Sequence, residues 1–242
     1  MLQEKDIVVV GASAGGVQAL RTLVAGLPAD LRAAVFVVLH TSPLHKSTLA
    51  EILTRAGPLP AKHPKDGERI ERGRIYVAPP NRHLVLEEDR VRVVFGPAEN
   101  RFRPAMDPLF RSAASVYGPR VAGIVLSGTL SDGCNGLIEI KQKGGLTVVQ
   151  DPKEAEFPQL PLNVLRRLDV DYILPAVSIA ELLRTAIATP VEEESNRMTT
   201  NEPEPHFSGL TCPDCDGPIM EVNDGSVLRF QCIVGHAYSP TR

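Results

Sequence analysis

Short apolar runs alternate with amphipathic segments along most of the chain. The apolar runs do not alternate apolar and polar residues as a half-buried strand does. A continuous apolar run is typical of a parallel strand that is buried on both faces. They predict strands at residues 7–11, 33–40, 73–79, 121–128, 146–150 and 171–176. The amphipathic segments carry apolar residues at helical spacing. They predict helices at residues 17–27, 49–57, 107–118, 137–145, 162–170 and 178–188.

One segment, residues 83–96, instead alternates apolar and polar positions around a Glu-Glu-Asp turn. This pattern predicts an antiparallel hairpin with one solvated face. Residues 58–73 before it are polar and predict an irregular connection. The whole pattern predicts an α/β fold with a doubly wound, mostly parallel sheet and an antiparallel hairpin.

Three predicted helices have start signals in the sequence. Thr48 and Glu51 have the spacing of a capping box. Asp107 is a cap residue directly before Pro108, which suits the first position of a helix. Ser178 is the expected cap of the last helix.

The composition changes after the last predicted helix. Residues 189–209 are charged, contain prolines and have few large apolar side chains, so they predict a flexible linker. The sequence therefore divides into a large α/β domain at residues 1–188, this linker, and a small module at residues 210–242.

The chain has 242 residues, 43% of them hydrophobic, which is enough for one sizeable α/β domain and a small appendage. Its formal net charge of −3 argues against nucleic acid or an anionic membrane as a partner. No apolar run approaches the roughly 20 residues of a membrane span, and the first residues are not laid out as a signal peptide. We therefore expect a cytoplasmic protein without direct membrane insertion.

Residues 6–16, DIVVVGASAGG, lead from the first predicted strand into the first predicted helix. They contain the G-x-S-x-G pattern of a nucleophile elbow, with Ser13 on a tight turn between small residues. Unpaired N–H groups at the start of a helix can stabilise a developing oxyanion. Two other interpretations stay open: a phosphate-binding or dinucleotide turn, although the G-x-G-x-x-G spacing is absent, and a plain N-cap role for Ser13.

His40 ends the second predicted strand, and Asp132 lies a few residues past the fourth. Ligands of open parallel sheets bind at the carboxyl ends of the strands, so we expect both residues near Ser13. Serine needs a neighbouring base, histidine can take and return its proton, and a carboxylate fixes the histidine tautomer. The order Ser, His, Asp disfavours the α/β-hydrolases. Taken singly, His40 could be a structural residue and Asp132 a turn or cap residue.

The other candidate nucleophile and bases receive no role in this chemistry. Cys134 has no base assigned to it by spacing, so we interpret it as a packing residue. His45, His63 and His83 fall in or beside predicted loops and carry no assignment.

Cys212, Cys215, Cys232 and His236 have the spacing C-x2-C-x16-C-x3-H. Three thiolates and one imidazole complete a tetrahedral zinc shell, and a module this short cannot bury a sufficient core alone. The segment between the two pairs predicts a hairpin turning at residues 223–225, as in a zinc ribbon. We expect a structural zinc here; the alternative is a reduced, metal-free tail.

Five motifs, in order, resemble the catalytic domain of the chemotaxis protein-glutamate methylesterases, the CheB family. GASAGG resembles the family's GASTGG, VVLH its IVQH, FRPAMDPLF its RPSVDVLF, LSGTLSDGCNGL its LTGMGSDGAxGL, and VVQDP its AQD segment. They cover about residues 1–185. The resemblance implies a modified Rossmann-like domain that hydrolyses glutamate methyl esters on chemoreceptors and releases methanol. Some family members also deamidate glutamine.

Residue by residue, the resemblance implies that Ser13 is the nucleophile, His40 the base and Asp132 the acid, with no cofactor for catalysis. Three departures from the family pattern matter, and one is the weak match of residues 159–161, Gln-Leu-Pro, to the family's GMP segment. Ala14 replaces a threonine after the nucleophile, and Thr129 replaces a methionine beside the oxyanion site. A backbone N–H group survives a side-chain replacement, so Ala14 and Thr129 are still expected near the oxyanion and the substrate.

The resemblance also implies partners, first a methylated chemoreceptor or a similar signalling protein. Family members typically carry an N-terminal receiver domain, whereas this sequence begins at the first strand of the catalytic domain. We therefore expect regulation by another route, or by a separate receiver or methyltransferase protein. The C-terminal module resembles an extension found on some receiver-less relatives.

Three functions are thus compared: a serine hydrolase acting on protein glutamate methyl esters, a catalytically weak or idle binding module, and a nucleotide-binding domain. The last lacks both the dinucleotide spacing and a P-loop lysine and ranks lowest. The first predicts a geometry, in which Ser13 Oγ lies within roughly 3–4 Å of one His40 ring nitrogen and Asp132 reaches the other.

Overall fold

Seven parallel strands form the main sheet of the protein, in the order β10-β9-β8-β1-β2-β5-β3. The structure is a computed structural model and describes residues 5–42, 46–187, 206–223, 228–232 and 234–238. The strands are β1 (Ile7–Ala12), β2 (Ala34–Leu39), β3 (Ala61–Lys62), β5 (Arg74–Val77), β8 (Val121–Val125), β9 (Leu146–Gln150) and β10 (Tyr172–Leu174). The predicted doubly wound sheet is confirmed, and β3 is an additional strand within the predicted polar connection.

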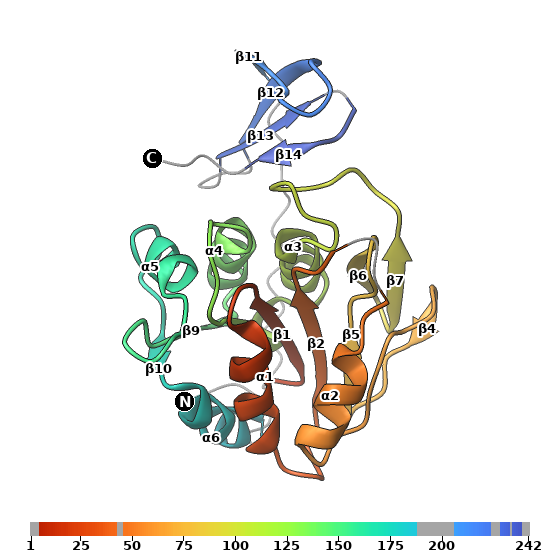
Figure 1. The fold of residues 1–242 in the computed structure, drawn as a ribbon, viewed down its shortest axis with the longest axis vertical. Coiled ribbons are helices and arrows are strands. Elements are labelled where there is room, and N and C mark those ends of the chain that lie inside the picture. The colour runs from red at the N-terminus through yellow and green to blue at the C-terminus, as the bar shows by residue number, and fades with distance from the viewer. Residues whose placement is uncertain (1–4, 43–45, 188–205, 224–227, 233, 239–242) are drawn as a thin grey trace.

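Helices cover both faces of this sheet (Figure 1). One face packs on α1 (Gly16–Ala25), α2 (Leu49–Ala56) and α6 (Ala176–Ile187); the other packs on α3 (Met106–Tyr117), α4 (Cys134–Gln142) and α5 (Gln159–Leu165). Successive residues of a strand point to opposite faces. Val8 and Val10 therefore join the first core and Val9 the second, and all three are fully buried. This double burial explains the continuous apolar run of β1.

A small antiparallel sheet flanks the second core, with the strand order β4-β7-β6. Its strands are β4 (Glu68–Arg69), β6 (His83–Glu87) and β7 (Arg90–Val94). The predicted hairpin of β6 and β7 is confirmed. The short strand β4 comes from the segment that we expected to be irregular. A single turn of 3₁₀ helix, η1 (Gly118–Arg120), follows α3.

None of the three predicted cap side chains caps its helix. Thr48 is the N-cap of α2, but its side chain makes no capping hydrogen bond; Ser47 Oγ accepts from Leu49 N–H instead, at 3.2 Å. Asp107 lies inside α3, whose N-cap is Ala105. Ser178 likewise lies inside α6, which begins at Ala176.

The C-terminal module, residues 206–238, is a separate antiparallel sheet in the order β11-β12-β13-β14. Its strands are β11 (His206–Thr211), β12 (Pro218–Asn223), β13 (Leu228–Cys232) and β14 (Ala237–Tyr238). Strands β12 and β13 form the predicted hairpin, while residues 224–225 of its predicted turn lie outside the described residues. Strand β11 begins four residues before the expected start of the module, and residues 189–205 of the predicted linker lie outside the described residues.

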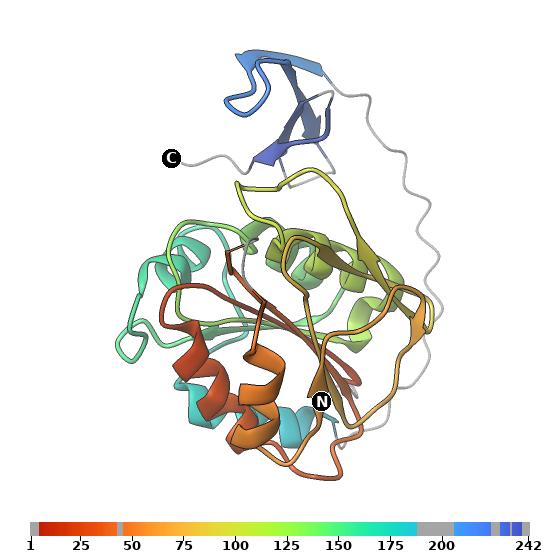
Figure 2. The same ribbon diagram turned by 45° about the vertical axis from the view of Figure 1, so that its right-hand side comes forward.

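We call residues 5–187 the body. The module stands beyond the carboxyl ends of β1 and β2 of the body, as Figures 1 and 2 both show. In the part of the chain that the structure describes, no helix combines the length and the apolar character needed to cross a membrane.

Candidate active site

Ser13 lies directly after β1, on a turn that is closed by backbone contacts. Its N–H donates to Ser127 O at 3.0 Å, and Ser127 Oγ donates to Ala14 O at 2.8 Å. Gly15 is the N-cap of α1 and has φ 70°, a conformation that suits glycine. A Cβ on Gly15 would lie 2.6 Å from Ser127 Oγ, so the turn has no room for a larger residue. Because Gly15 occupies the cap position, the N-cap interpretation of Ser13 is wrong.

The main sheet brings the three candidate triad residues to one edge. Strand β1 pairs with β2 on one side and with β8 on the other. His40 follows β2, and Asp132 lies between β8 and α4, before Gly133 with φ 91° at the cap of α4. The chain runs from β1 outward to β2, β3 and β5 and then returns to β8, on the other side of β1. The strand order therefore reverses between the neighbouring strands β1 and β8, and this position is a topological switch point. Ligands of open α/β sheets bind at such points.

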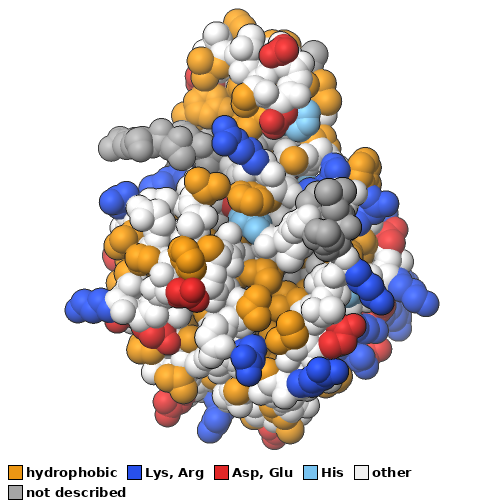
Figure 3. Space-filling view, in the orientation of Figure 1, with side chains coloured by type: hydrophobic (Ala, Val, Ile, Leu, Met, Phe, Trp, Pro, Cys, Tyr) orange, Lys and Arg blue, Asp and Glu red, His pale blue; other side chains and the backbone are white. Residues whose placement is uncertain are grey.

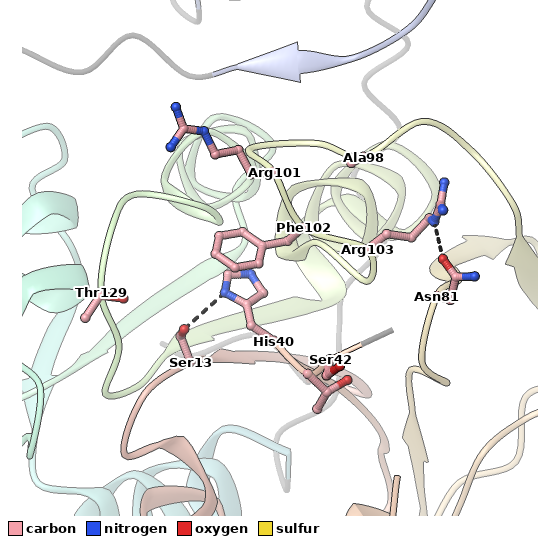
Figure 4. A pocket seen from close by; sticks show the side chains of 10 residues that line it. Ser13, His40, Ser42, Asn81, Ala98, Arg101, Phe102, Arg103 and Thr129 are labelled. Atoms are coloured by element: carbon pink, nitrogen blue, oxygen red, sulfur yellow. Dashed lines mark hydrogen bonds between the residues drawn. The ribbon is translucent and has the colours of Figure 1, made fainter. Parts of the chain in front are cut away.

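Ser13, His40 and Asp132 form one hydrogen-bonded chain. Ser13 Oγ lies 3.1 Å from His40 Nδ1 (Figure 4), and His40 Nε2 lies 2.7 Å from Asp132 Oδ2. Nδ1 thus faces the serine and Nε2 the carboxylate, the reverse of the ring orientation in the chymotrypsin template. An ionised carboxylate accepts only, so the ring proton belongs on Nε2 and the Nδ1 lone pair faces Ser13 Oγ–H. Phe102 stacks on the imidazole with ring centroids 3.5 Å apart.

Asp132 is fully buried, and hydrogen-bond donors surround its carboxylate. Oδ2 also accepts from Met106 N–H at 2.6 Å, while Oδ1 accepts from Asn100 Nδ2 at 2.9 Å and from Asp107 N–H at 3.4 Å. The two backbone donors are the first N–H groups of α3, where a negative charge is favoured. Burial raises the pKa of Asp132, but the hydrogen bonds, first that of His40, and the His40 charge outweigh it and hold this pKa below its usual value.

Asp107 is a second buried carboxyl beside Asp132. Its Oδ1 accepts from Gly136 N–H at 2.8 Å and its Oδ2 from Asn100 Nδ2 at 3.0 Å. Burial and then the neighbouring charge of Asp132 raise the pKa of Asp107 to about 7. Of the two carboxyls, Asp132 is therefore the one that stays ionised and can orient His40.

The sequence does not predict the places of Asn100 and Phe102 in the site or this role of Asp107. Asp107 has the local signature of a helix cap, and both Asp107 and Phe102 stand in the FRPAMDPLF motif, but the motif alone assigns neither of them a role. Asn100 and Arg101 have φ values of 51° and 71°, and an asparagine suits such a turn. That signal predicts the turn and not its position beside Asp132.

Ser13 opens into a cavity of about 540 Å³. Its lining residues are Ser13, His40, Thr41, Ser42, Asn81, Ala98, Arg101, Phe102, Arg103 and Thr129. Of the two expected oxyanion residues, Thr129 lines this cavity and Ala14 does not. No described residue accepts a hydrogen bond from the backbone N–H of Ala14 or of Thr129, so both donors are available.

The surroundings of Cys134 and His83 indicate structural roles and not roles in the chemistry. Burial raises the pKa of the Cys134 thiol to about 12, so it is protonated and a poor nucleophile. His83 Nε2 donates to Pro97 O at 2.8 Å, and its Nδ1 accepts from Ala105 N–H at 3.3 Å. His83 therefore ties both ends of the segment that carries Asn100. His45 lies outside the described residues.

The four predicted metal ligands come together in the C-terminal module. Their donor atoms all lie within 4.8 Å of one another. Cys215 Sγ lies 3.6 Å from Cys232 Sγ, and His236 Nδ1 lies 3.5 Å from Cys232 Sγ and 3.6 Å from Cys212 Sγ. Zinc–ligand bonds of about 2.3 Å to sulfur and 2.0–2.1 Å to nitrogen place tetrahedral neighbours about 3.8 Å (S to S) and 3.6 Å (S to N) apart. The residues therefore fit a tetrahedral metal ion.

The body of this chain matches a known protein family. Residues 8–183 match the family described as CheB methylesterase. The chain belongs to the CheB methylesterase family. The match lies within the body and covers nearly all of it, and the Cys/His cluster lies outside the match.

Two relatives and one solved structure illustrate the relationship of this CheB-family chain. A protein of Leptospira interrogans named putative protein-glutamate methylesterase/protein-glutamine glutaminase is 38% identical over 178 residues, which are 73% of this chain and 92% of the relative. A Methanosarcina acetivorans protein-glutamate methylesterase/protein-glutamine glutaminase is 38% identical over 185 residues, but the match spans only 52% of its length. The Thermotoga maritima CheB methylesterase catalytic domain is 31% identical, has a TM-score of 0.71, and is covered over 97% of its length and 74% of this chain.

Proposed function

We propose that this protein is a protein-glutamate methylesterase of chemotaxis or a related signalling pathway, with Ser13, His40 and Asp132 as its catalytic triad. The observation that carries the proposal is the hydrogen-bonded chain of these three side chains at the switch point of the sheet. Membership of a methylesterase family supports the reaction class.

The geometry supports an acyl-transfer mechanism. His40 Nδ1 takes the proton of Ser13 Oγ as the oxygen attacks the ester carbonyl, and Asp132 stabilises the imidazolium through Nε2–H. His40 then gives its proton to the leaving methoxide, and methanol departs. His40 next activates water, which releases the glutamate carboxylate and regenerates Ser13.

The tetrahedral intermediate carries a negative oxygen that needs hydrogen-bond donors. The free N–H groups of Ala14 and Thr129 are our candidates, because each follows a strand of the switch point closely. Backbone donors do not depend on the side chain, so the replacement of the family's threonine and methionine leaves this function in place.

A methylated chemoreceptor or similar signalling protein is the proposed substrate. Arg101 lies at the rim of the cavity (Figure 4). On the face shown in Figure 3, lysine and arginine side chains gather on both sides of the junction between the module and the body. A basic rim favours a peptide whose methylated glutamate has acidic neighbours.

Glutamine deamidation is a second candidate reaction, because the relatives are named for both activities. The chemistry differs only in the leaving group, which is ammonia instead of methanol.

For the module we propose a structural zinc held by the four clustered ligands, with no part in the ester chemistry. Zinc completes folding of small modules that have little core of their own. We also propose that the body is the catalytic domain, that the module starts at His206 rather than at residue 210, and that the protein works in the cytoplasm, with a separate receiver or methyltransferase protein as a regulatory partner.

Hydrolysis by matched variants tests the function. Methanol release from a methylated receptor fragment and from a small glutamate methyl ester is measured for wild type, Ser13→Ala, His40→Ala and Asp132→Asn. We expect kcat to fall by about 10³-fold or more without Ser13 or His40, and by less for Asp132→Asn. A folded wild type that hydrolyses neither substrate overturns the enzyme function and leaves a binding module of the same fold.

A further inference from the structure

The C-terminal module touches the segment that lines the candidate active site. Asn100 N–H donates to Ala237 O at 2.7 Å, and Glu99 forms an isolated β-bridge with Ala237. Gly235 packs against Pro97, where a Cβ would lie 2.7 Å from Pro97 Cγ. These contacts come from the residues that directly surround one of the four clustered ligands.

The same segment reaches the triad from its other side. The Asn100 side chain donates to Asp132 Oδ1 and to Asp107 Oδ2, and Phe102 stacks on His40. Asn100 is thus hydrogen-bonded to the module through its backbone and to the catalytic carboxylate through its side chain. Asn100 thereby connects the module to the candidate triad.

The conformation of this segment needs support. Glu99 and Phe102 exchange backbone hydrogen bonds of 3.1 and 2.9 Å around Asn100 and Arg101, both with positive φ, as in a type I′ turn. We call residues 99–102 the Asn100 turn. Positive φ is unfavourable for residues other than glycine and persists where the surroundings impose it. Arg111 holds Glu99 by two bonds of 2.8 Å from the body, and Ala237 holds Asn100 from the module.

The module has little apolar core with which to hold Ala237 in place. Among the described residues of the module, the buried core cluster consists of Cys212, Ile219 and Cys232, of which two are ligands of the Cys/His cluster. Ala237 follows the fourth ligand directly. A bound metal would therefore fix the position from which Ala237 contacts the Asn100 turn.

We propose that the module is a clamp on the active site: when its Cys/His cluster holds a metal, Ala237 holds the Asn100 turn, and Asn100 acts as a positioning residue for Asp132. No described residue of the module lines the cavity, so the module positions the site without plugging it. The expected kinetic effect of the clamp rests on the proposed esterase function, whereas the structural coupling between the module and the Asn100 turn does not.

Hydrogen–deuterium exchange of the full chain tests the coupling without any activity measurement. Zinc-loaded protein is compared with protein stripped by a chelator. We expect backbone amides at residues 97–102 to exchange about tenfold faster or more after stripping, while those of β1 stay protected. Unchanged exchange at residues 97–102 while the module loses protection overturns the clamp. A module that stays fully protected without metal overturns its metal dependence.

Kinetics then test the positioning role. Asn100→Gly keeps the positive φ accessible and removes the carboxamide; Phe207→Ala alters an exposed side chain on β11 and is the control. We expect stripping to lower kcat of wild type and of Phe207→Ala by about tenfold to a hundredfold with little change in KM. In Asn100→Gly, whose kcat is already low, stripping adds less than about a twofold loss.

Independent, multiplicative losses in Asn100→Gly and on stripping overturn the route through Asn100. If no variant hydrolyses the ester while exchange at residues 97–102 responds to metal, the proposed function fails and the clamp stands.

Discussion

Asp107 and Asp132 show how burial alone does not decide a residue's role. Both carboxyls are almost inaccessible. Asp132 collects donors from His40, Asn100 and the start of α3, whereas Asp107 faces the charge of Asp132. The sequence predicted Asp132 from its place after a strand. It could not predict the role of Asp107, because that role depends on Asn100 and on Gly136 of another helix.

His83 gives a prediction at the same scale. Burial lowers its pKa from the usual 6.5, so the neutral ring bridges Pro97 O and Ala105 N–H in the fold. The unfolded chain binds the proton more readily, so the stabilisation by His83 is complete above pH 6.5 and is lost as the pH falls below it. Urea unfolding should show His83→Gln less stable by about 1–3 kcal/mol at pH 8, with a smaller difference at pH 5. A difference that grows on acidification contradicts this assignment.

At the scale of elements, the apolar pattern predicted most strands and helices of the body because burial decides them. The helix predicted at residues 162–170 is misplaced, since α5 spans Gln159–Leu165 and includes Pro161. Helix caps failed for a physical reason. The first N–H groups of α3 are satisfied by Asp132, which lies 26 residues away along the chain, and no local cap is needed. Strands β3 and β4 have two residues each, too few to show a periodicity.

The contact between α3 and α4 predicts an effect opposite to helix propensity. Alanine usually stabilises a helix relative to glycine, but a Cβ on Gly136 would lie 2.4 Å from Phe110 Cβ. We expect Gly136→Ala to lower the free energy of unfolding by about 1–3 kcal/mol and to reduce kcat, because Gly136 N–H also holds Asp107. Lys143→Ala, at the exposed end of α4, is the control and should change stability by less than about 0.5 kcal/mol. A stabilised Gly136→Ala protein would show that the helices can separate freely.

For the whole molecule, the sequence predicted two units and the Cys/His cluster of the small one, but not that the units meet beside the candidate active site. The contact is made mainly by backbone groups of Asn100 and Ala237, and any sequence could supply these. Residue types therefore carry no signal of it.

The basic rim yields a prediction about substrate size. Arg101→Ala should raise KM for a methylated receptor fragment about two- to fivefold, since exposed ion pairs contribute little, and leave the small ester unaffected. Arg32 is exposed and lies just before the start of β2, at the end of the strand opposite to the candidate site. Arg32→Ala is therefore the matched control. An equal effect of Arg101→Ala on both substrates would place Arg101 in the chemistry and not in receptor binding.

Covalent trapping tests the central claim most directly. The full chain is treated with a fluorophosphonate, which reacts with an activated serine, and the modified residue is located by peptide mass spectrometry. We predict one adduct per chain, on Ser13, formed by wild type and nearly absent in His40→Ala, because the serine is activated by that base. A folded wild type that gives no adduct, or an adduct on another residue, contradicts the account.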